Sequence, residues 1–498
     1  MAAKTLEDWQ KMRDGLSYRN QAFIDGKYVD AASGKTFDCT SPIDGRLLAK
    51  VAECDKEDVD RAVKAARKAF DSGKWSELSP VKRKAVMLKL AQLVRENSDE
   101  LALLETLDMG KPVMMAKNVD MNGVANNFQW YGEAIDKMYD EIAPTDRSGL
   151  GLITREPMGV VGAVVPWNFP LMMAAWKLAP MLATGNSVVL KPAEQSPLTA
   201  IRLAELAMEA GLPEGVLNVL PGFGETAGQA LGMHMDVDGI SFTGSTEVGK
   251  YFLKYSGLSN MKAIALECGG KTPNIVMKDA PNLEAAAREA GSAIFFNSGQ
   301  VCLASSRLLV EQDIKDEFLE KVKEVGQFMQ PGDPLDPKTM MGTMVDNTQT
   351  KRVLGYIEAG QKEGAKLVLG GKQVRQNTGG EYIEPTIFDN VKNSMKIAQE
   401  EIFGPVLSTL TFKDAEEAIQ IANDSVYGLY ANLWTNDLTK AHKMARKIRA
   451  GTVNINNTNG GGLVMPFGGY KQSGLGRDGS LHAMEKFTQM KATYIHLG

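Results

Sequence analysis

The stretch from residue 159 to residue 255 constrains the fold most, because short apolar runs alternate there with helical segments. The β-rich runs are 159–167, 187–190, 215–220 and 239–242, and the helical segments after them are 171–182, 198–209, 225–231 and 246–255. Helices between neighbouring strands act as crossover connections, so the strands are expected to lie parallel in one sheet. The stretch therefore predicts an α/β domain of the dinucleotide-binding type, in which ligands bind at the carboxyl ends of the strands.

A second alternating set begins after residue 267 and predicts another α/β domain. Its expected strands are 274–277, 307–310, 366–369 and 452–455, and its expected helices are 283–296, 314–325, 350–363 and 415–422. Upstream, residues 23–29 predict a hairpin around Asp25-Gly26, and 56–70 and 81–97 predict amphipathic helices. The fold class we expect is therefore α/β, with two parallel-sheet, Rossmann-like domains.

Composition excludes several classes of protein. A chain of 498 residues is long enough for two or three domains. Its net charge of -5 provides no polybasic surface for nucleic acid or an anionic membrane. Four scattered cysteines are too few for a disulfide framework, and four histidines without HExxH or CxxC motifs predict no metal site. Without an apolar run of about 18 residues or a leader pattern, we expect a cytoplasmic protein.

Cys302 lies in the segment FFNSGQVCLASSR, directly after the helical stretch 283–296. A cysteine where a helix gives way to a loop is accessible enough to react, and Phe295 and Phe296 can shield it from bulk water. A lone cysteine in an apolar run is, however, more often a small buried hydrophobic residue than a nucleophile. The segment alone favours the second interpretation.

Polar and small residues follow several of the expected strands. Thr243, Gly244 and Ser245 precede a helix, where free backbone N–H groups favour a pyrophosphate, although an ordinary capped turn explains them about equally well. Lys191 and Glu194 follow another strand and can hydrogen-bond ribose hydroxyls. A carboxylate there repels a 2′-phosphate and favours NAD over NADP. A solvated surface pair is the alternative.

Together with Asn168 and Glu267, these candidate residues are compatible with a single reaction. The Asn168 amide can stabilise an oxyanion, although asparagine also serves as a helix N-cap. Glu267 follows the apolar run AIAL and precedes two glycines, which favours a general base in a cleft over a solvated charge. A Cys302 thiolate can add to an aldehyde, with the oxyanion held by Asn168 and the Cys302 N–H. Hydride then leaves for a nicotinamide, and Glu267 activates water against the thioester.

The chain resembles the NAD(P)-dependent aldehyde dehydrogenases over nearly its whole length. The motifs PWNFP, KPAEQSP, FTGSTEVG, LECGGKTP, GQVC and EEIFGPV occur in the family's order and spacing. The branch it resembles is that of the bacterial γ-glutamyl-γ-aminobutyraldehyde and aminoaldehyde dehydrogenases. The resemblance implies irreversible oxidation of an aldehyde to the carboxylic acid with NAD. It makes Cys302 the nucleophile, Glu267 the base, Asn168 the oxyanion donor and Lys177 a proton-relay residue.

The resemblance also implies cofactor and substrate contacts. The expected cofactor-binding residues are Pro166, Trp167, Lys191, Glu194, Gly224, Thr243, Gly244, Ser245, Gln349, Glu401 and Phe403. The residues expected to line a substrate tunnel are Phe169, Met172, Met173, Trp176, Phe296, Val301, Leu303, Asn459 and Phe467. A tunnel rich in Met and Phe tolerates several shapes. We therefore expect broad specificity for medium or bulky aldehydes, with aromatic and γ-glutamylamino aldehydes as candidates.

A domain division follows from the same resemblance. It implies an NAD-binding domain at 1–134 and 156–266, a catalytic domain at 267–476, and a small β oligomerisation arm at 135–155 and 477–498. The arm implies a homodimer or homotetramer, with no nucleic-acid or membrane partner.

Four other functions stay open. A cationic aminoaldehyde dehydrogenase uses acidic anchors, but Asn459 and Gly123 stand where relatives often carry them, although Asp120 remains. A coenzyme A-acylating dehydrogenase has little use for the water-activating Glu267. A cofactor-free cysteine hydrolase needs a histidine partner for Cys302, and no histidine has a motif-like context. A non-catalytic binding protein is the fourth, since a fold alone never establishes activity.

Overall fold

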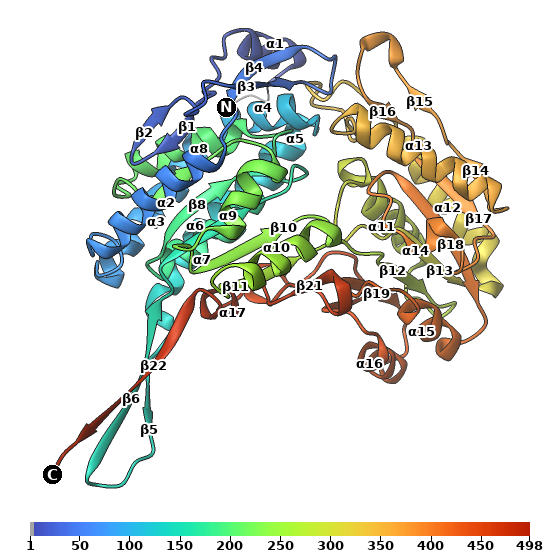
Figure 1. Cartoon of the computed structure of the whole chain (residues 1–498). Helices are drawn as coiled ribbons and strands as arrows, with labels where there is room; N and C mark the ends of the chain where they lie inside the picture. The colour runs from blue at the N-terminus through green and yellow to red at the C-terminus, as the bar shows by residue number, and fades with distance from the viewer. Residues whose placement is uncertain (1–3) are drawn as a thin grey trace.

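The computed structural model describes residues 4–498, which form two α/β domains and a projecting β arm (Figure 1). The first sheet has the strand order β2-β1-β9-β8-β7-β10-β11-β21. Its strands are β1 (Ala22–Ile24), β2 (Lys27–Val29), β7 (Val160–Val164), β8 (Ser187–Lys191), β9 (Leu217–Val219), β10 (Gly239–Thr243), β11 (Ala263–Glu267) and β21 (Gly474–Leu475). The five strands from β9 to β11 are parallel, whereas β1, β2 and β21 add antiparallel edges.

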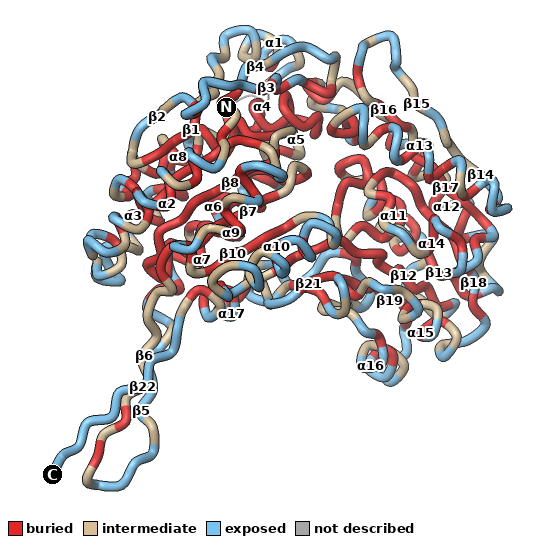
Figure 2. Tube along the Cα trace, viewed as in Figure 1, coloured by how far each residue is buried: buried red, intermediate tan, exposed pale blue. Residues whose placement is uncertain are grey.

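Helices cover both faces of this sheet. They are α2 (Lys56–Asp71), α3 (Pro80–Glu96), α4 (Ser98–Met109), α6 (Asn122–Ala134), α7 (Pro170–Ala183), α8 (Leu198–Glu209), α9 (Gln229–Met233) and α10 (Thr246–Leu258). Alternate residues of β8 belong to different hydrophobic cores. Val188 and Leu190 pack with α7 and α8, and Val189 packs with α2 and α10 on the other face of the sheet. The strand is buried on both faces for this reason, which explains its continuous apolar run (Figure 2).

The second sheet has the strand order β14-β17-β18-β13-β12-β19-β20. Its strands are β12 (Pro273–Val276), β13 (Arg307–Glu311), β14 (Lys366–Leu369), β17 (Thr386–Asp389), β18 (Val406–Phe412), β19 (Tyr430–Trp434) and β20 (Thr452–Ile455). Its helices are α11 (Leu283–Phe295), α12 (Lys315–Phe328), α13 (Asn347–Lys362), α14 (Lys396–Gln399), α15 (Ala415–Asn423) and α16 (Leu438–Lys447). All strands of this sheet are parallel except β14, an antiparallel edge.

The predicted set of strands for this domain was incomplete. Sequence analysis omitted β17, β18 and β19, although β18 and β19 are central to the sheet. β17 follows β16 with no helix between them, and loops of six residues separate β18 and β19 from the helices before them. In the first domain, the helix expected at 225–231 begins with a π-helical turn, Gly224–Gly228, before α9.

The arm is a three-stranded antiparallel sheet of β5 (Glu141–Ala143), β6 (Gly149–Pro157) and β22 (Thr488–His496). It extends away from both domains and is largely exposed (Figures 1 and 2). Large apolar side chains lie exposed on the arm and just before it: Tyr139, Ile142, Met490, Tyr494, Ile495 and Leu497. None of the helices in the described part of the chain combines the length and apolarity that crossing a bilayer requires.

The remaining elements are small. They are α1 (Leu6–Asp14), β3 (Thr36–Thr40), β4 (Leu47–Ala52), α5 (Val113–Met115), the π-helical turn Ala116–Met121, β15 (Gln373–Val374), β16 (Tyr382–Ile383) and α17 (His482–Glu485). The chain path places two junctions side by side. In the first sheet the chain runs from β7 to β8 and β9 on one side, and the connection after β9 returns to β10 on the other side of β7, so the strand order reverses between β7 and β10. Such a switch point opens a crevice at the strands' carboxyl ends.

Candidate active site

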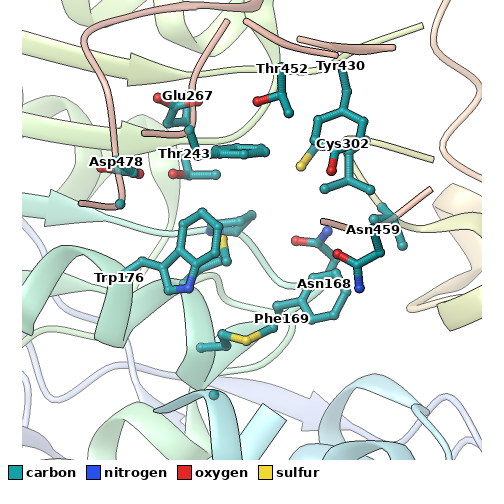
Figure 3. Close-up of a pocket in the computed structure, with 18 of the residues that line it drawn as sticks. Asn168, Phe169, Trp176, Thr243, Glu267, Cys302, Tyr430, Thr452, Asn459 and Asp478 are labelled. Carbon is teal, nitrogen blue, oxygen red and sulfur yellow. The ribbon is translucent and has the colours of Figure 1, made fainter. Parts of the chain in front are cut away.

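A cavity of ≈ 1100 Å³ opens at this switch point and reaches the loop before β13. Segments that follow β7, β10 and β11 line it from the first domain, and residues 301–303 line it from the second. Figure 3 shows Cys302, Asn168 and Glu267 within this one cavity. The structure therefore brings together side chains that lie up to 134 residues apart in the chain, the distance from Asn168 to Cys302.

The cofactor-side residues near the switch point form a small, polar wall. Pro166, Trp167, Thr243, Gly244 and Ser245 all line the cavity. The Thr243 hydroxyl is buried and has no hydrogen-bond partner. A Cβ on Gly244 would overlap the Phe242 ring, so only glycine fits there. The first backbone N–H groups of α10 follow directly, and such groups bind phosphate. The residues present fit a dinucleotide.

Three other predicted cofactor residues do not line this cavity. Lys191 and Glu194 lie at and after the end of β8, and their Nζ and Oε2 atoms form an ion pair of 3.2 Å. The Lys191 ammonium also donates to the Pro192 carbonyl, and burial lowers its pKa. Gly224 begins the π-helical turn and has open space where a Cβ would stand. The three residues lie at or after the carboxyl ends of β8 and β9, the strands to one side of β7.

The second domain contributes a loop to the cofactor-side wall of the cavity, next to Trp167. Gln349 Nε2 donates to the Phe403 carbonyl at 2.8 Å, and Glu401 Oε1 accepts the Gly270 N–H at 3.1 Å. Burial raises the pKa of Glu401 to about 7. Phe403 has a left-handed backbone, φ 59°, and its ring meets the Trp167 ring edge-on at 5.2 Å. The loop thereby joins the two domains beside the cavity.

The turn before Cys302 is held in an unusual conformation. Asn297, Ser298 and Gly299 are left-handed in succession, with φ values of 50°, 54° and 71°. A Cβ on Gly299 would overlap the Gly404 carbonyl, so glycine is required by both φ and space. Left-handed non-glycine residues persist only where their surroundings fix them. The turn is therefore a rigid support for Cys302.

Gln300 is the side chain that fixes this turn, and sequence analysis missed its role. It is fully buried; its Nε2 donates to the Asn297 and Thr343 carbonyls, and its Oε1 accepts the Val345 N–H. Its backbone carbonyl accepts a bond of 2.8 Å from Asn168 Nδ2. A buried glutamine with all three groups paired rigidifies the segment around it. Its position two residues before a candidate nucleophile was the available signal.

Asn168 is not a helix N-cap. The cap of α7 is Phe169, and no side chain makes a capping bond there. The Asn168 amide has two N–H donors, of which one bonds the Gln300 carbonyl. The second is available to an oxygen in the cavity that Asn168 lines. This geometry suits an oxyanion donor.

The Cys302 thiol lines the cavity between the cofactor-side residues and the residues predicted for the substrate tunnel. Burial, together with the carboxylates of Glu401 and Glu267, raises its pKa to about 12. In the protein without ligands the thiol is therefore almost wholly protonated near neutral pH. A thiolate at this position needs a positive charge nearby, because only the thiolate is a strong nucleophile.

Glu267 lies at the end of β11, and neither carboxylate oxygen has a hydrogen-bond partner. Its pKa is raised well above the usual range, first by burial and then by the Asp478 carboxylate, whereas Lys177 lowers it. A Cβ on Gly468 would stand 2.7 Å from Oε1, so the carboxylate lies against bare backbone. An unpaired buried carboxylate of raised pKa suits proton abstraction from water.

Lys177 and Asp478 form a buried ion pair of 2.6 Å beside Glu267. Lys177 is fully buried on α7 and does not itself line the cavity, whereas Asp478 does. Asp478 is a functional candidate that sequence analysis missed. The only local signal was an acidic residue in the glycine-rich turn GLGRDG, a context that more often indicates a solvated loop.

The opposite end of the cavity is mostly aromatic and aliphatic. All nine residues predicted for the substrate tunnel line the cavity. Phe169 stacks on Phe296 at 6.2 Å, and Trp176 meets Phe467 edge-on at 5.3 Å. Sequence analysis missed further lining residues from α6, β19 and the 458–466 loop: Trp130, Glu133, Tyr430, Thr458, Leu463, Met465 and Pro466.

Asp120 does not reach the cavity. It is fully buried in the π-helical turn, and the Lys111 ammonium pairs with it at 2.5 Å and with Glu105 at 3.0 Å. The same ammonium lies 4.0 Å from the centre of the Phe169 ring, on the far side of the tunnel wall. Among residues 4–498, no three His, Cys, Asp or Glu side chains are arranged to hold a metal ion.

Comparison with known proteins gives a consistent result. Residues 28–493 match the aldehyde dehydrogenase family. The chain is 52% identical over 493 residues to the NADP/NAD-dependent aldehyde dehydrogenase PuuC of Escherichia coli (strain K12), and the match covers 99% of each protein.

Two solved structures have the same fold. One is an indole-3-acetaldehyde dehydrogenase complexed with NAD+, which is 62% identical with a TM-score of 0.99. The other is a γ-glutamyl-γ-aminobutyraldehyde dehydrogenase from Burkholderia cenocepacia J2315, which is 57% identical with a TM-score of 0.98. Each match covers 99% of this chain and 100% of the other.

Proposed function

The chain belongs to the aldehyde dehydrogenase family, and from that premise we propose how its residues oxidise an aldehyde and which aldehydes it takes. It is an NAD-dependent aldehyde dehydrogenase. The mechanism and the substrate class follow from the cavity.

In the proposed first step, the Cys302 thiol loses its proton to solvent, and the resulting thiolate adds to the aldehyde carbonyl and forms a thiohemiacetal. The free amide N–H of Asn168 and the backbone N–H of Cys302 stabilise the oxyanion. Removing one such donor from an enzyme typically costs on the order of 10²–10³ in rate. The rigid turn of residues 297–300 supports this step, because it fixes the sulfur relative to the amide.

When bound, NAD accepts the hydride that leaves the substrate carbon. Glu401, Phe403, Gln349 and the strand ends after β7 and β10 would hold it, with Lys191 and Glu194 toward its ribose hydroxyls. The product on the protein is a Cys302 thioester. Glu267 then takes a proton from water, which attacks the thioester and releases the carboxylic acid.

The single observation that carries this proposal is the shared cavity of Cys302, Asn168 and Glu267 with the switch-point residues (Figure 3). The unpaired Glu267 carboxylate also argues against transfer of the acyl group to coenzyme A. The enzyme should form NADH and carboxylic acid in equal amounts without coenzyme A. A strict requirement for coenzyme A would overturn this proposal.

We propose medium or bulky aldehydes as substrates, including aromatic and γ-glutamylamino aldehydes. The aromatic pairs Phe169–Phe296 and Trp176–Phe467 favour flat or extended apolar groups. Asp120 offers no charge to the cavity, since Lys111 neutralises it within the protein. Two relatives carry names that fit this class, an indole-3-acetaldehyde dehydrogenase and a γ-glutamyl-γ-aminobutyraldehyde dehydrogenase.

A cationic aminoaldehyde is the second candidate, and one residue favours it. Glu133 lines the cavity and is exposed, although Gln129 donates to its Oε1 at 2.9 Å. A protein 45% identical to this chain is named aminoacetaldehyde dehydrogenase. The test compares kcat/KM for aromatic, aliphatic and ω-amino aldehydes, with Glu133→Gln beside the wild type. A large advantage for ω-amino aldehydes that Glu133→Gln removes would replace our first candidate.

We propose the domain division given by the sequence and a homo-oligomer held by the arm. Residues 1–134 and 156–266 would bind NAD, 267–476 would carry catalysis, and 135–155 and 477–498 would join subunits in a dimer or tetramer. The exposed Tyr494, Ile495 and Leu497 side chains support the second part, since exposed apolar patches mark interaction sites. Size-exclusion chromatography with light scattering tests it.

A further inference from the structure

A second lysine lies behind the base and has no role in the mechanism above. Asp478 is 1% exposed, and its Oδ2 pairs with Lys177 while its Oδ1 pairs with the Lys486 ammonium. Lys486 directly follows α17, far in sequence from both α7 and β11. We call Glu267, Asp478, Lys177 and Lys486 the base cluster. It contains two carboxylates and two ammonium groups.

The charges of the base cluster balance only when Lys486 is counted. Asp478 and Lys177 neutralise each other, which would leave an ionised Glu267 as a lone buried charge. Burying an unpaired charge is very costly, and the group usually stays neutral instead. Lys486 supplies the second positive charge. Its side chain keeps 15% exposure, so it is also the cluster member best placed to contact water.

Among the other groups that face Glu267, only Arg477 also favours its ionisation, and it does so less than Lys486. The Arg477 guanidinium donates to the Gly469 and Gly476 carbonyls and lies over the Tyr470 ring. The Cys302 and Cys268 thiols are neutral near pH 7, because burial raises the pKa of each to about 12. The Asp478 carboxylate opposes ionisation of Glu267, and Lys177, Lys486 and Arg477 favour it. Lys486 acts on Glu267 through space and by holding Asp478.

We propose, on the basis of the proposed function, that Lys486 is a positioning residue for thioester hydrolysis. It holds the second oxygen of Asp478 and provides the positive charge that lets Glu267 ionise when it activates water. It touches neither substrate nor cofactor, because it does not line the cavity. The step that should depend on it is therefore hydrolysis and not acylation.

The experiment compares Lys486→Met with Lys486→Arg, which keeps the charge, and with Lys491→Met. Lys491 pairs with Glu156 on the exposed arm and is a matched control outside the base cluster. The NADH burst and the steady rate after it are measured from pH 6 to pH 10. We expect Lys486→Met to retain the burst but to lose about tenfold in the steady rate near pH 7. The pH of half-maximal rate should rise by about one unit, which corresponds to a tenfold change in ionisation.

Two further results complete the expectation. Lys486→Arg should restore most of the steady rate, and Lys491→Met should behave as the wild type. The rates of Lys486→Met and wild type should converge at high pH, where Glu267 ionises in both. An unchanged pH profile in Lys486→Met, or a loss of equal size at every pH, would overturn the inference by showing no role or a structural one.

Failure of the inference and of the proposed function give different results. If Glu267→Gln turns over like the wild type, Glu267 is not the base and the proposed function fails. If Glu267→Gln stalls after the burst while Lys486→Met shows a normal pH profile, only the inference fails. Should Lys486→Met not fold, as judged by its melting temperature, Lys486→Gln compared with Lys486→Arg gives the same decision.

Discussion

The two ends of the cavity are built by different means. The cofactor end consists of strand ends and loops held by backbone geometry, such as the left-handed residues Asn297, Gly299 and Phe403. The substrate end consists mostly of aromatic and aliphatic side chains from α6, α7 and the 458–467 loop, which meet in stacked and edge-on contacts. Backbone geometry tolerates few changes, whereas packed side chains can be exchanged for others of similar volume. We therefore expect the cofactor end to tolerate few substitutions, and the substrate end to tolerate exchanges between side chains of similar volume.

The largest expected effect comes from the residue at which both ends meet. Cys302→Ala should lower NADH formation with every aldehyde by on the order of 10⁴-fold or more, because no other group can form the thioester. NAD binding should stay intact, since the cofactor end does not depend on the sulfur. Stopped-flow NADH formation and calorimetric titration with NAD measure the two properties. Residual turnover within tenfold of the wild type would show that the chemistry lies elsewhere.

Asn168→Ala tests the proposed oxyanion donor, which lines the cavity beside Cys302. Loss of its amide should lower kcat by on the order of 10²-fold, with a smaller change in KM, because the donor acts most strongly in the transition state. Its bond to the Gln300 carbonyl also disappears, so Asn168→Asp serves as a comparison that keeps size but removes the donor. The measurement is kcat and KM of each variant in the steady state. An effect confined to KM would show that Asn168 contributes to ground-state binding instead.

Gly299→Ala tests whether the cofactor end is strict. The added Cβ meets the Gly404 carbonyl at a left-handed position, so the turn must shift. We expect about a tenfold loss in kcat/KM for every aldehyde and a lower melting temperature. Gly257→Ala is the control, because a Cβ there has open space. Equal behaviour of the two variants would show that the turn is flexible.

Phe467→Leu makes the smallest change and tests whether the substrate end is adaptable. The leucine keeps an apolar wall but loses the edge-on contact with Trp176. We expect kcat/KM for aromatic aldehydes to fall about threefold and that for short aliphatic aldehydes to change little. The ratio of the two kcat/KM values is the measurement. A loss of the same size for both classes would mean that Phe467 supports the site rather than selecting the substrate.

Sequence reasoning predicted the strand-to-helix boundaries of the cofactor end well, but it named only part of the lining of the substrate end. Strand-to-helix boundaries such as Thr243 to Thr246 follow from local periodicity, and the structure has them within a residue or two. The tunnel residues Trp130, Tyr430 and Met465 come from three distant segments, and nothing local indicates that they meet. The central strand β19 was missed because a loop of six residues separates it from α15, so no helix-to-strand boundary marks its start.

Buried charges were the other part that sequence could not predict. Asp478 and Lys486 occupy a turn and a short helix end whose composition is typical of an exposed surface. Their burial arises only when β21 pairs with the end of β11 and α17 packs against α7. Gln300 is similar, because two of its three partners, Thr343 and Val345, lie in a loop 43 and 45 residues further along the chain.

The most direct test of the shared cavity is to trap the covalent intermediate. Glu267→Gln should still form the thioester but hydrolyse it slowly, so mixing it with NAD and an aldehyde should give about one NADH per subunit. Mass spectrometry should then find the acyl group on the peptide that contains Cys302. Turnover at the wild-type rate without an adduct, or an adduct on Cys268 or any other residue, would contradict this account.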